Sequence, residues 1–194
     1  AGFHPHDADQ AKPGYLKELE SLLGHPKCVA IGEIGLDFHY DRSPREIQER
    51  LFREELDLAK SLDKPVIIHS RLAEEQALEM TLACGLKRAL FHCFTGKLDT
   101  GRAIQAAGFL IGVTGIVTFN NPSNAELVAG LDPEKLVTET DCPFLAPKPF
   151  RGKRCEPAHA ALVLQKLAGL FPGWSAERLA DNIRRHSDRF IFPV

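Results

Sequence analysis

The chain has 194 residues, and its 24 basic and 26 acidic side chains leave a formal net charge of −2. With 44 % hydrophobic and 26 % charged residues, it has the composition of a folded globular protein, which excludes disordered and collagen-like chains. The near-zero net charge also argues against a protein that coats nucleic acid, so any such contact has to come from a local patch or a bound metal.

The cysteines bear on the cellular compartment. Their odd number and the absence of a C-x-x-C pair argue against a disulfide framework and a structural zinc knuckle. We therefore expect reduced thiols in a cytoplasmic protein. No apolar run approaches the roughly 18 residues of a membrane span and no signal peptide is evident, so no membrane partner is expected. The cysteines are Cys28, Cys84, Cys93, Cys142 and Cys155.

Six short apolar runs predict β-strands. They lack the alternation of a half-exposed strand, which is typical of strands buried on both faces of a parallel sheet. In chain order the runs are 2–4, 29–34, 65–69, 89–92, 109–113 and 136–138.

Amphipathic segments between these runs predict helices. Ser43 to Glu46 forms an S-x-x-E capping box with Pro44 at the first helical position. Asp99 is expected to cap a helix that ends at Gly108, and Asn121 precedes a helix near 125–131. The last two helices are expected over 156–171 and 175–189.

Alternating strands and helices with short connections predict a parallel sheet with right-handed crossovers. An open doubly wound sheet usually carries a G-x-G-x-x-G loop after its first strand, and the stretch Gly32-Glu33-Ile34-Gly35 does not match it. We therefore predict an α/β protein with the TIM (β/α)8 barrel fold, with about six of the eight strands present and a single domain over residues 1–194.

Potential metal ligands follow or end most of these strands. In barrels the carboxyl ends of the strands gather the catalytic side chains. Histidine nitrogen with carboxylate oxygen suits zinc and manganese, whereas magnesium prefers oxygen alone. A lone histidine is more often a core residue and a lone aspartate a turn former, but convergence at one end of successive strands favours a metal site. The residues are His4, His6, Glu33, His69, His92 and Asp141.

Six sequence stretches carry a resemblance to a known family. In order and spacing they resemble the motifs of the TatD family, metal-dependent deoxyribonucleases of the amidohydrolase superfamily with a TIM-barrel fold. The stretches are Gly2-Phe3-His4-Pro5-His6, Gly32-Glu33-Ile34-Gly35-Leu36-Asp37, His69-Ser70-Arg71, His92-Cys93-Phe94-Thr95-Gly96, Glu139-Thr140-Asp141-Cys142-Pro143 and Arg151-Gly152-Lys153-Arg154-Cys155-Glu156-Pro157.

This resemblance implies a hydrolase that cleaves DNA with one or two divalent ions (Mg, Mn or Zn). The implied metal ligands are Glu33, His69, His92 and Asp141, and Glu33 is able to bridge two ions. Asp141 holds a second ion or accepts the proton of the attacking water, and His4 lies beside the substrate. Other implied substrate contacts are His6, Arg71, Arg151 and Arg154, the last two in a cationic loop with Lys148 and Lys153.

Two other functions remain open from the sequence. A related hydrolase of a small amide or ester would not need the cationic loop at 148–154. A non-catalytic, N-terminally truncated fragment is the other alternative. Family members usually begin with two further strand-helix units, and a full barrel takes about 250 residues, so we expect those two units to be missing. Asp37 is expected to cap a loop or to orient a ligand, outside the ligand set.

Overall fold

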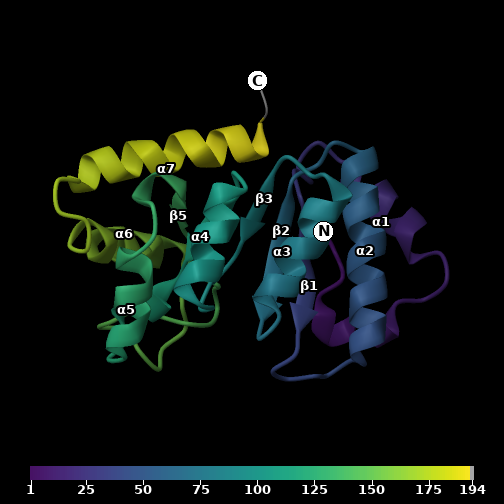
Figure 1. Cartoon of the computed structure of the whole chain (residues 1–194), viewed down its shortest axis with the longest axis horizontal. Coiled ribbons are helices and arrows are strands. Elements are labelled where there is room, and N and C mark those ends of the chain that lie inside the picture. Colours follow the sequence, from purple (N-terminus) through teal and green to yellow (C-terminus); the bar gives the residue numbers. More distant parts are fainter. Residues whose placement is uncertain (193–194) are drawn as a thin grey trace. The chain divides into compact units, whose positions relative to one another are not determined.

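The computed structural model of the chain describes residues 1–192 and consists of two compact units (Figure 1). The first comprises residues 1–91, 107–109 and 190–192. The second comprises residues 92–106 and 110–189. Each unit is described by itself.

The first unit is a three-stranded parallel arrangement flanked by helices. Strand β1 pairs with β2 and β2 with β3, with Gly35 opposite His69 and Ile68 opposite Phe91. Helix α2 packs on β1 (Figure 1). The elements are η1 (Pro5–Gln10), α1 (Tyr15–Leu23), β1 (Ile31–Asp37), α2 (Arg45–Ser61), β2 (Val66–Arg71), α3 (Glu74–Cys84) and β3 (Ala89–Phe91).

The core of this unit follows from the apolar strands and one face of α2. Ile31, Ile34 and Ile68 are completely buried. Leu51 and Phe52 of α2 are also buried, at 2 % and 1 % exposure. Burial of such side chains contributes about 1.5–3 kcal/mol each. This packing fixes the strands whose ends carry the candidate ligands.

The second unit contains one parallel strand pair and most of the remaining helices. Strands β4 and β5 pair with Gly112 opposite Val137. Helix α6 packs on η2 and β5. The elements are α4 (Leu98–Ala106), β4 (Leu110–Val113), η2 (Gly115–Thr118), α5 (Pro122–Ala129), η3 (Pro133–Lys135), β5 (Leu136–Thr138), η4 (Pro157–His159), α6 (Ala160–Ala168) and α7 (Ala176–Ile191), the last belonging to this unit as far as residue 189.

The prediction of a first strand at 2–4 is wrong, so residues 1–192 contain five assigned strands rather than six. The segment makes one ladder-like bond, from the Gly32 N–H to the Ala1 carbonyl. The Phe3 N–H instead donates to the Glu55 Oε1 atom of α2 at 2.7 Å. The backbone of this segment is therefore bound by the Glu55 side chain of a helix rather than by a neighbouring strand. Helices α1 and α3 were not predicted.

The helix signals were partly right. Asn121 caps α5 by accepting the Ser123 N–H, as predicted. The predicted capping box at Ser43 is wrong, because α2 begins after Pro44 without a side-chain cap. The Ser43 hydroxyl instead donates to the His6 carbonyl and contacts the Asp9 carboxylate, at 3.1 and 2.9 Å. It ties η1 to the start of α2.

None of the helices among residues 1–192 combines the length and apolar character needed to cross a membrane. The prediction of a single domain over 1–194 stays a prediction.

Candidate metal centre

The first unit brings three of the predicted site residues together. Glu33 lies on β1, His69 near the end of β2, and His4 directly precedes η1. Parallel register places Gly35 beside His69, and a Cβ atom at Gly35 would lie 2.0 Å from the His69 carbonyl oxygen. Only glycine, at φ +138°, permits this approach of β1 to β2. Gly35 thus allows β1, which carries Glu33, to lie close to His69 on β2.

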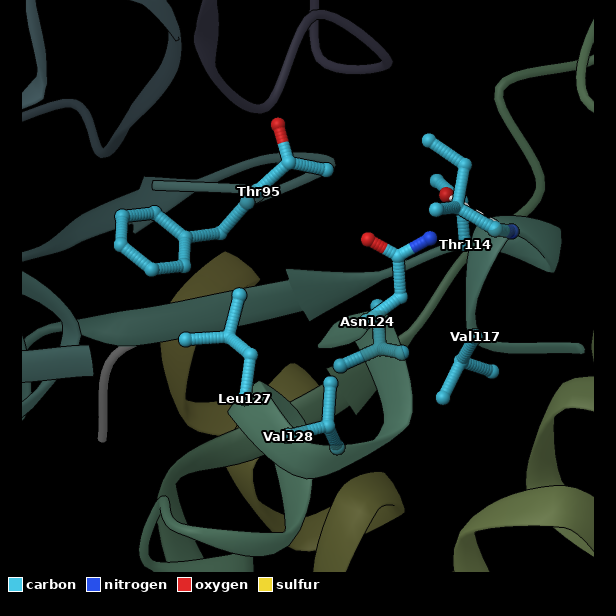
Figure 2. A pocket seen from close by; sticks show the side chains of 9 residues that line it. Thr95, Thr114, Val117, Asn124, Leu127 and Val128 are labelled. Atoms are coloured by element: carbon cyan, nitrogen blue, oxygen red, sulfur yellow. Dashed lines mark hydrogen bonds between the residues drawn. The ribbon is translucent and has the colours of Figure 1, made fainter. Parts of the chain in front are cut away.

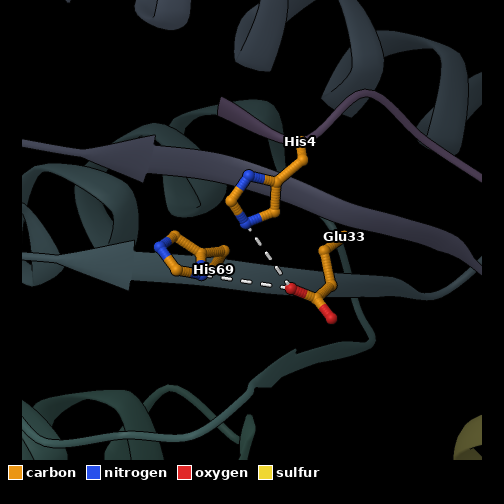
Figure 3. Close-up of side chains that lie close together, drawn as sticks. All are labelled: His4, Glu33 and His69. Atoms are coloured by element: carbon orange, nitrogen blue, oxygen red, sulfur yellow. Dashed lines mark ion pairs between the residues drawn. The ribbon is translucent and has the colours of Figure 1, made fainter. Parts of the chain in front are cut away.

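The Glu33 carboxylate faces both histidines (Figure 3). Its Oε2 atom lies 3.7 Å from His4 Nε2 and 4.0 Å from His69 Nδ1. The three donor atoms lie within 4.8 Å of one another. These separations exceed normal hydrogen bonds and suit donor atoms that converge on a cation. Glu33 is half-buried, with 38 % of its side chain exposed.

Asp37, at the end of β1, organises the histidines from behind. Its Oδ2 atom lies 2.8 Å from His6 Nε2 and 3.0 Å from His69 Nε2. Burial acts to raise the pKa of Asp37, but hydrogen bonds from the Tyr40 N–H, His6 and His69 outweigh it and lower the pKa to about 2. The ionised carboxylate only accepts, so both Nε2 atoms must be the donors. The lone pair of His69 therefore lies on Nδ1, the atom that faces Glu33.

His4 has the opposite arrangement of its two ring nitrogens. Its Nδ1 atom accepts the backbone N–H of His6 at 3.2 Å. In the neutral ring this leaves the proton on Nε2, the atom directed at Glu33. The hydrogen bonds therefore make His69 a lone-pair donor suited to a metal and His4 a proton donor. The family resemblance implies His69 as a ligand and His4 as a residue beside the substrate, and that division stays a prediction.

Gln48 of α2 supports Asp37 in turn. It is 1 % exposed, accepts the Asp37 N–H at 2.8 Å and donates to the Ser43 carbonyl at the same distance. The Asp37 carboxylate also accepts the backbone N–H groups of His39 and Tyr40. Asp37 is thus held from several directions, which fixes the positions of His6 and His69.

The second unit carries the other two predicted ligands. A nitrogen of His92 and a carboxylate oxygen of Asp141 lie within 4.8 Å of each other. His92 is 7 % exposed, and its Nδ1 atom lies 3.3 Å from Glu139 Oε2. Glu139 Oε1 accepts the Cys93 N–H at 2.7 Å. Glu139 therefore orients His92, as Asp37 orients His69.

From the sequence, Asp37 is expected to cap a loop or to orient a ligand, and the structure shows both contacts, but the role of Glu139 was missed. Both lie in the motif stretches, and each follows or ends a strand. A histidine that ligates a metal usually donates its other ring nitrogen to a carboxylate or carbonyl. A search for a carboxylate at the end of each strand next to a ligand histidine would have identified both. Without the register of the strands, neither could be matched to its histidine.

The predicted substrate-binding cations lie in two places. Arg71 ends β2 in the first unit, is exposed and stands over the Tyr40 ring. In the second unit Arg151 lies 3.7 Å from the centre of the Phe119 ring, and Arg154 is exposed in the same loop. Among the described residues, no carboxylate forms an ion pair with Arg71, Arg151 or Arg154. Their charges are available to an anionic ligand.

A small pocket lies beside β4 and α5. Thr95, Thr114 and Asn124 give it a polar edge over Val117, Leu127 and Val128 (Figure 2). Its free volume is about 10 Å³, room for roughly one water molecule. The candidate ligands do not line it.

The donor set of the first unit fits a divalent transition metal. It supplies one imidazole lone pair and one carboxylate, with a buried carboxylate behind the imidazole, which is the usual arrangement around a metal-bound histidine. The His92 and Asp141 pair of the second unit repeats this combination, with Glu139 behind the imidazole.

Comparison with known proteins places the chain among metal-dependent hydrolases. The family model described as "TatD related DNase" matches residues 1–191. The chain is 41 % identical over 172 residues to the uncharacterized metal-dependent hydrolase YabD of Bacillus subtilis, covering 87 % of this chain and 68 % of YabD. It is 37 % identical over 195 residues to the 3'-5' ssDNA/RNA exonuclease TatD of Escherichia coli, covering 95 % of this chain and 75 % of that protein.

Solved structures give the same result for the fold. The crystal structure of YJJV, a TatD homolog from Escherichia coli, matches with a TM-score of 0.91 and 30 % identity, covering 98 % of this chain and 74 % of that one. A TatD family hydrolase from Entamoeba histolytica matches with a TM-score of 0.88 at 24 % identity, covering all of this chain and 74 % of that one. The predicted α/β, TIM-barrel fold class is confirmed.

Proposed function

The chain belongs to the TatD related DNase family, and from this we propose that it is a metal-dependent nuclease that hydrolyses phosphodiester bonds of DNA. The observation that carries the proposal is the cluster of His4, Glu33 and His69, in which one carboxylate faces a proton donor and a lone-pair donor. A divalent ion that stabilises charge and a group that donates a proton to the leaving oxygen both accelerate phosphodiester hydrolysis.

We propose Glu33, His69, His92 and Asp141 as the metal ligands, with one or two ions of Mg, Mn or Zn per chain. His69 and His92 each have a carboxylate on one ring nitrogen, Asp37 and Glu139, which fixes the ring and raises its basicity. A divalent ion, when bound, stabilises negative charge on the phosphoryl group and makes water more acidic. The mixed nitrogen and oxygen donors favour Mn or Zn over Mg.

The protein residues have separate tasks in the proposed reaction. The oxygen of a water molecule attacks phosphorus, the P–O ester bond to the leaving nucleoside breaks, and Asp141 accepts the proton that the water loses. His4 donates the proton on Nε2 to the departing ester oxygen, because its Nδ1 atom is already occupied by the His6 N–H. His6, Arg71, Arg151 and Arg154 contact the phosphates of the substrate.

The unpaired arginines favour a nucleic acid over the alternative of a small amide or ester, which has no charge for them to bind. Since the name of the Escherichia coli relative specifies single-stranded DNA and RNA, we propose single strands as the substrate of this chain. We also propose a cytoplasmic location, because none of the five cysteines forms a disulfide and reduced thiols persist in that compartment.

The test is cleavage of a labelled single-stranded oligonucleotide by protein stripped of metal and then supplied with Mg, Mn or Zn separately. We expect metal-dependent cleavage, and we expect His69→Ala and Asp141→Asn to reduce its rate by more than roughly 100-fold. Even mutation of a residue that only hydrogen-bonds to a metal ligand typically lowers metal affinity or activity by about 10–100-fold. His25→Ala, at an exposed histidine of the same unit, serves as the control and retains activity. Cleavage that both variants retain would exclude this site.

A further inference from the structure

Tyr40 is an exposed aromatic ring on a fixed backbone beside the candidate metal centre. It is 50 % exposed. Its backbone N–H donates to Asp37 Oδ1 at 2.8 Å, so the loop that carries it is anchored to the same carboxylate that holds His69. An exposed ring on an anchored backbone can bind a ligand with little loss of conformational entropy.

Two arginines flank this ring. The guanidinium carbons of Arg71 and Arg42 lie 4.9 and 5.5 Å from the ring centre. Arg71 also contacts the Tyr40 hydroxyl at 3.5 Å. Both arginines are exposed, and among residues 1–192 neither forms an ion pair with a carboxylate. Arg45 in the same segment differs, because it lies over Phe38 and pairs with Asp41 at 2.6 Å.

A single side chain separates this group from the candidate metal centre. The His6 ring meets the Tyr40 ring edge-on, with centres 5.4 Å apart. On its other side His6 lies 4.4 Å from the His4 ring, again measured between centres. A nucleotide on Tyr40 would therefore be the neighbour of a phosphodiester held at His4 and Glu33.

We propose that Tyr40, Arg42 and Arg71 form a nucleotide subsite, here termed the Tyr40 platform, which stacks one unpaired base and binds its flanking phosphates. The proposal rests on the nuclease function above and extends it by naming the recognised feature of the substrate. A base stacks on an aromatic ring whatever its identity, and arginine adds phosphate contacts and cation–π attraction.

The stacked base takes the place of one guanidinium on the ring. The displaced arginine then reaches the adjacent phosphate, where its planar fork binds two oxygens. In a duplex both faces of a base are covered by its neighbours, so the Tyr40 platform selects single strands. It selects them without reading sequence.

The first experiment measures binding of a short fluorescent single strand to the metal-free protein in chelator, where no cleavage occurs. A matched strand lacks the bases and keeps the sugar-phosphate chain. We expect the strand with bases to bind about 5- to 150-fold more tightly than the abasic strand. Tyr40→Ala should bring this affinity ratio close to one, whereas Tyr40→Phe, which keeps the ring, should retain the ratio.

A second series separates the cations from the ring. Arg42→Gln and Arg71→Gln weaken binding of both strands, and each reduces the log–log slope of affinity against salt by about 0.7 for every phosphate that the protein no longer neutralises. Arg45→Gln is the matched control, because that arginine is already paired with Asp41, and it leaves the slope unchanged.

The outcomes distinguish this inference from the proposed function. If Tyr40→Ala preserves the preference for bases, or if the wild-type protein shows no such preference or no binding, the Tyr40 platform is excluded, even when cleavage is intact. If the binding preference depends on Tyr40 but no metal supports cleavage, the nuclease proposal fails and the subsite stands.

Discussion

At the scale of single residues, Asp37 links the histidines of the candidate site to the loop that follows β1. One buried carboxylate accepts from two histidine rings and from two backbone N–H groups of the following loop. An aspartate that accepts four hydrogen bonds is strongly held in one orientation. Asp37 therefore determines which ring nitrogen of His69 faces Glu33.

Replacing Asp37 by Asn should weaken metal binding by roughly 10- to 100-fold. Both histidines contact Oδ2, and the backbone N–H groups of His39 and Tyr40 contact Oδ1. An amide nitrogen in either position therefore faces two other donors. Titration calorimetry with Mn or Zn measures the change. Asp41→Asn is the control, since that exposed aspartate pairs only with Arg45 on the surface. Equal affinity of the Asp37 variant and wild type would contradict the assigned role.

The buried carboxyl group of Glu55 should make the stability of the fold depend on pH. It is 0 % exposed, and burial raises its pKa from 4.5 to about 8, against the opposing effect of the Phe3 N–H. The folded state therefore keeps a proton that the unfolded state releases above pH about 4.5. Stability from this group is complete below that pH and is lost as the pH rises towards about 8.

Glu55→Gln should flatten this dependence, because the amide is neutral at every pH and still accepts from Phe3. Urea unfolding at intervals from pH 5 to pH 9 measures the free energy of unfolding. As the pH rises, the variant should become more stable relative to the wild-type protein. Glu46→Gln, at an exposed position of the same helix, keeps the wild-type profile. Parallel profiles for Glu55→Gln and wild type would show that Glu55 is ionised when folded.

At the scale of elements, two strands come unusually close to neighbouring groups at a glycine, each time beside a candidate ligand histidine. Gly35 of β1 lies against the backbone of His69, and Gly112 of β4 lies against the Glu139 carboxylate. A Cβ atom at Gly112 would lie 2.0 Å from Glu139 Oε1 and 3.1 Å from His92 Cα. Because these two positions carry no side chain, there is space beside them for the carboxylate-histidine pairs.

Gly112→Ala should therefore displace the Glu139 carboxylate and remove its bonds to His92 and the Cys93 N–H. We expect a loss of about 1–3 kcal/mol in the free energy of unfolding, typical of an overpacked site, together with weaker metal binding. Chemical denaturation and calorimetry measure the two effects. Gly169→Ala is the control, at a helix end with an ordinary φ of −75°. Wild-type metal affinity in Gly112→Ala would contradict the role of Glu139.

At the scale of the whole molecule, the rule that ligands follow parallel strands predicts Glu33, His69, His92 and Asp141 as ligands. The structure brings Glu33 close to His69 and His92 close to Asp141, and their role as ligands stays a prediction. That rule needs only buried apolar runs and a shared direction. It does not reveal contacts across the sequence, so it could not identify the histidines that Asp37 contacts, the role of Glu139 or the tautomer of His4. The strand expected at 2–4 failed for the same reason, because its N–H partner is Glu55 of a helix.

Metal should stabilise the whole chain against heat. An ion that binds only the folded state at 100 times its Kd adds about 2.7 kcal/mol, and each kcal/mol raises Tm by about 2–4 °C at this chain length. We therefore expect Mn or Zn to raise Tm by about 5–11 °C and a chelator to reverse the shift. His69→Ala should lose most of the shift, and His25→Ala should keep it. A metal-induced shift that survives in His69→Ala would place the ion elsewhere.

Asp37 has one further consequence, for energetic coupling between ligands. One of its oxygens holds the ring of His69, and the other holds the backbone N–H of Tyr40. An ion on His69 and a base on Tyr40 therefore act on the same carboxylate. If either tightens the binding of the other, the reverse effect must have the same factor, because coupling free energies are reciprocal. Titrating an uncleavable single strand at several manganese concentrations measures that factor, and Asp37→Asn should bring it towards one.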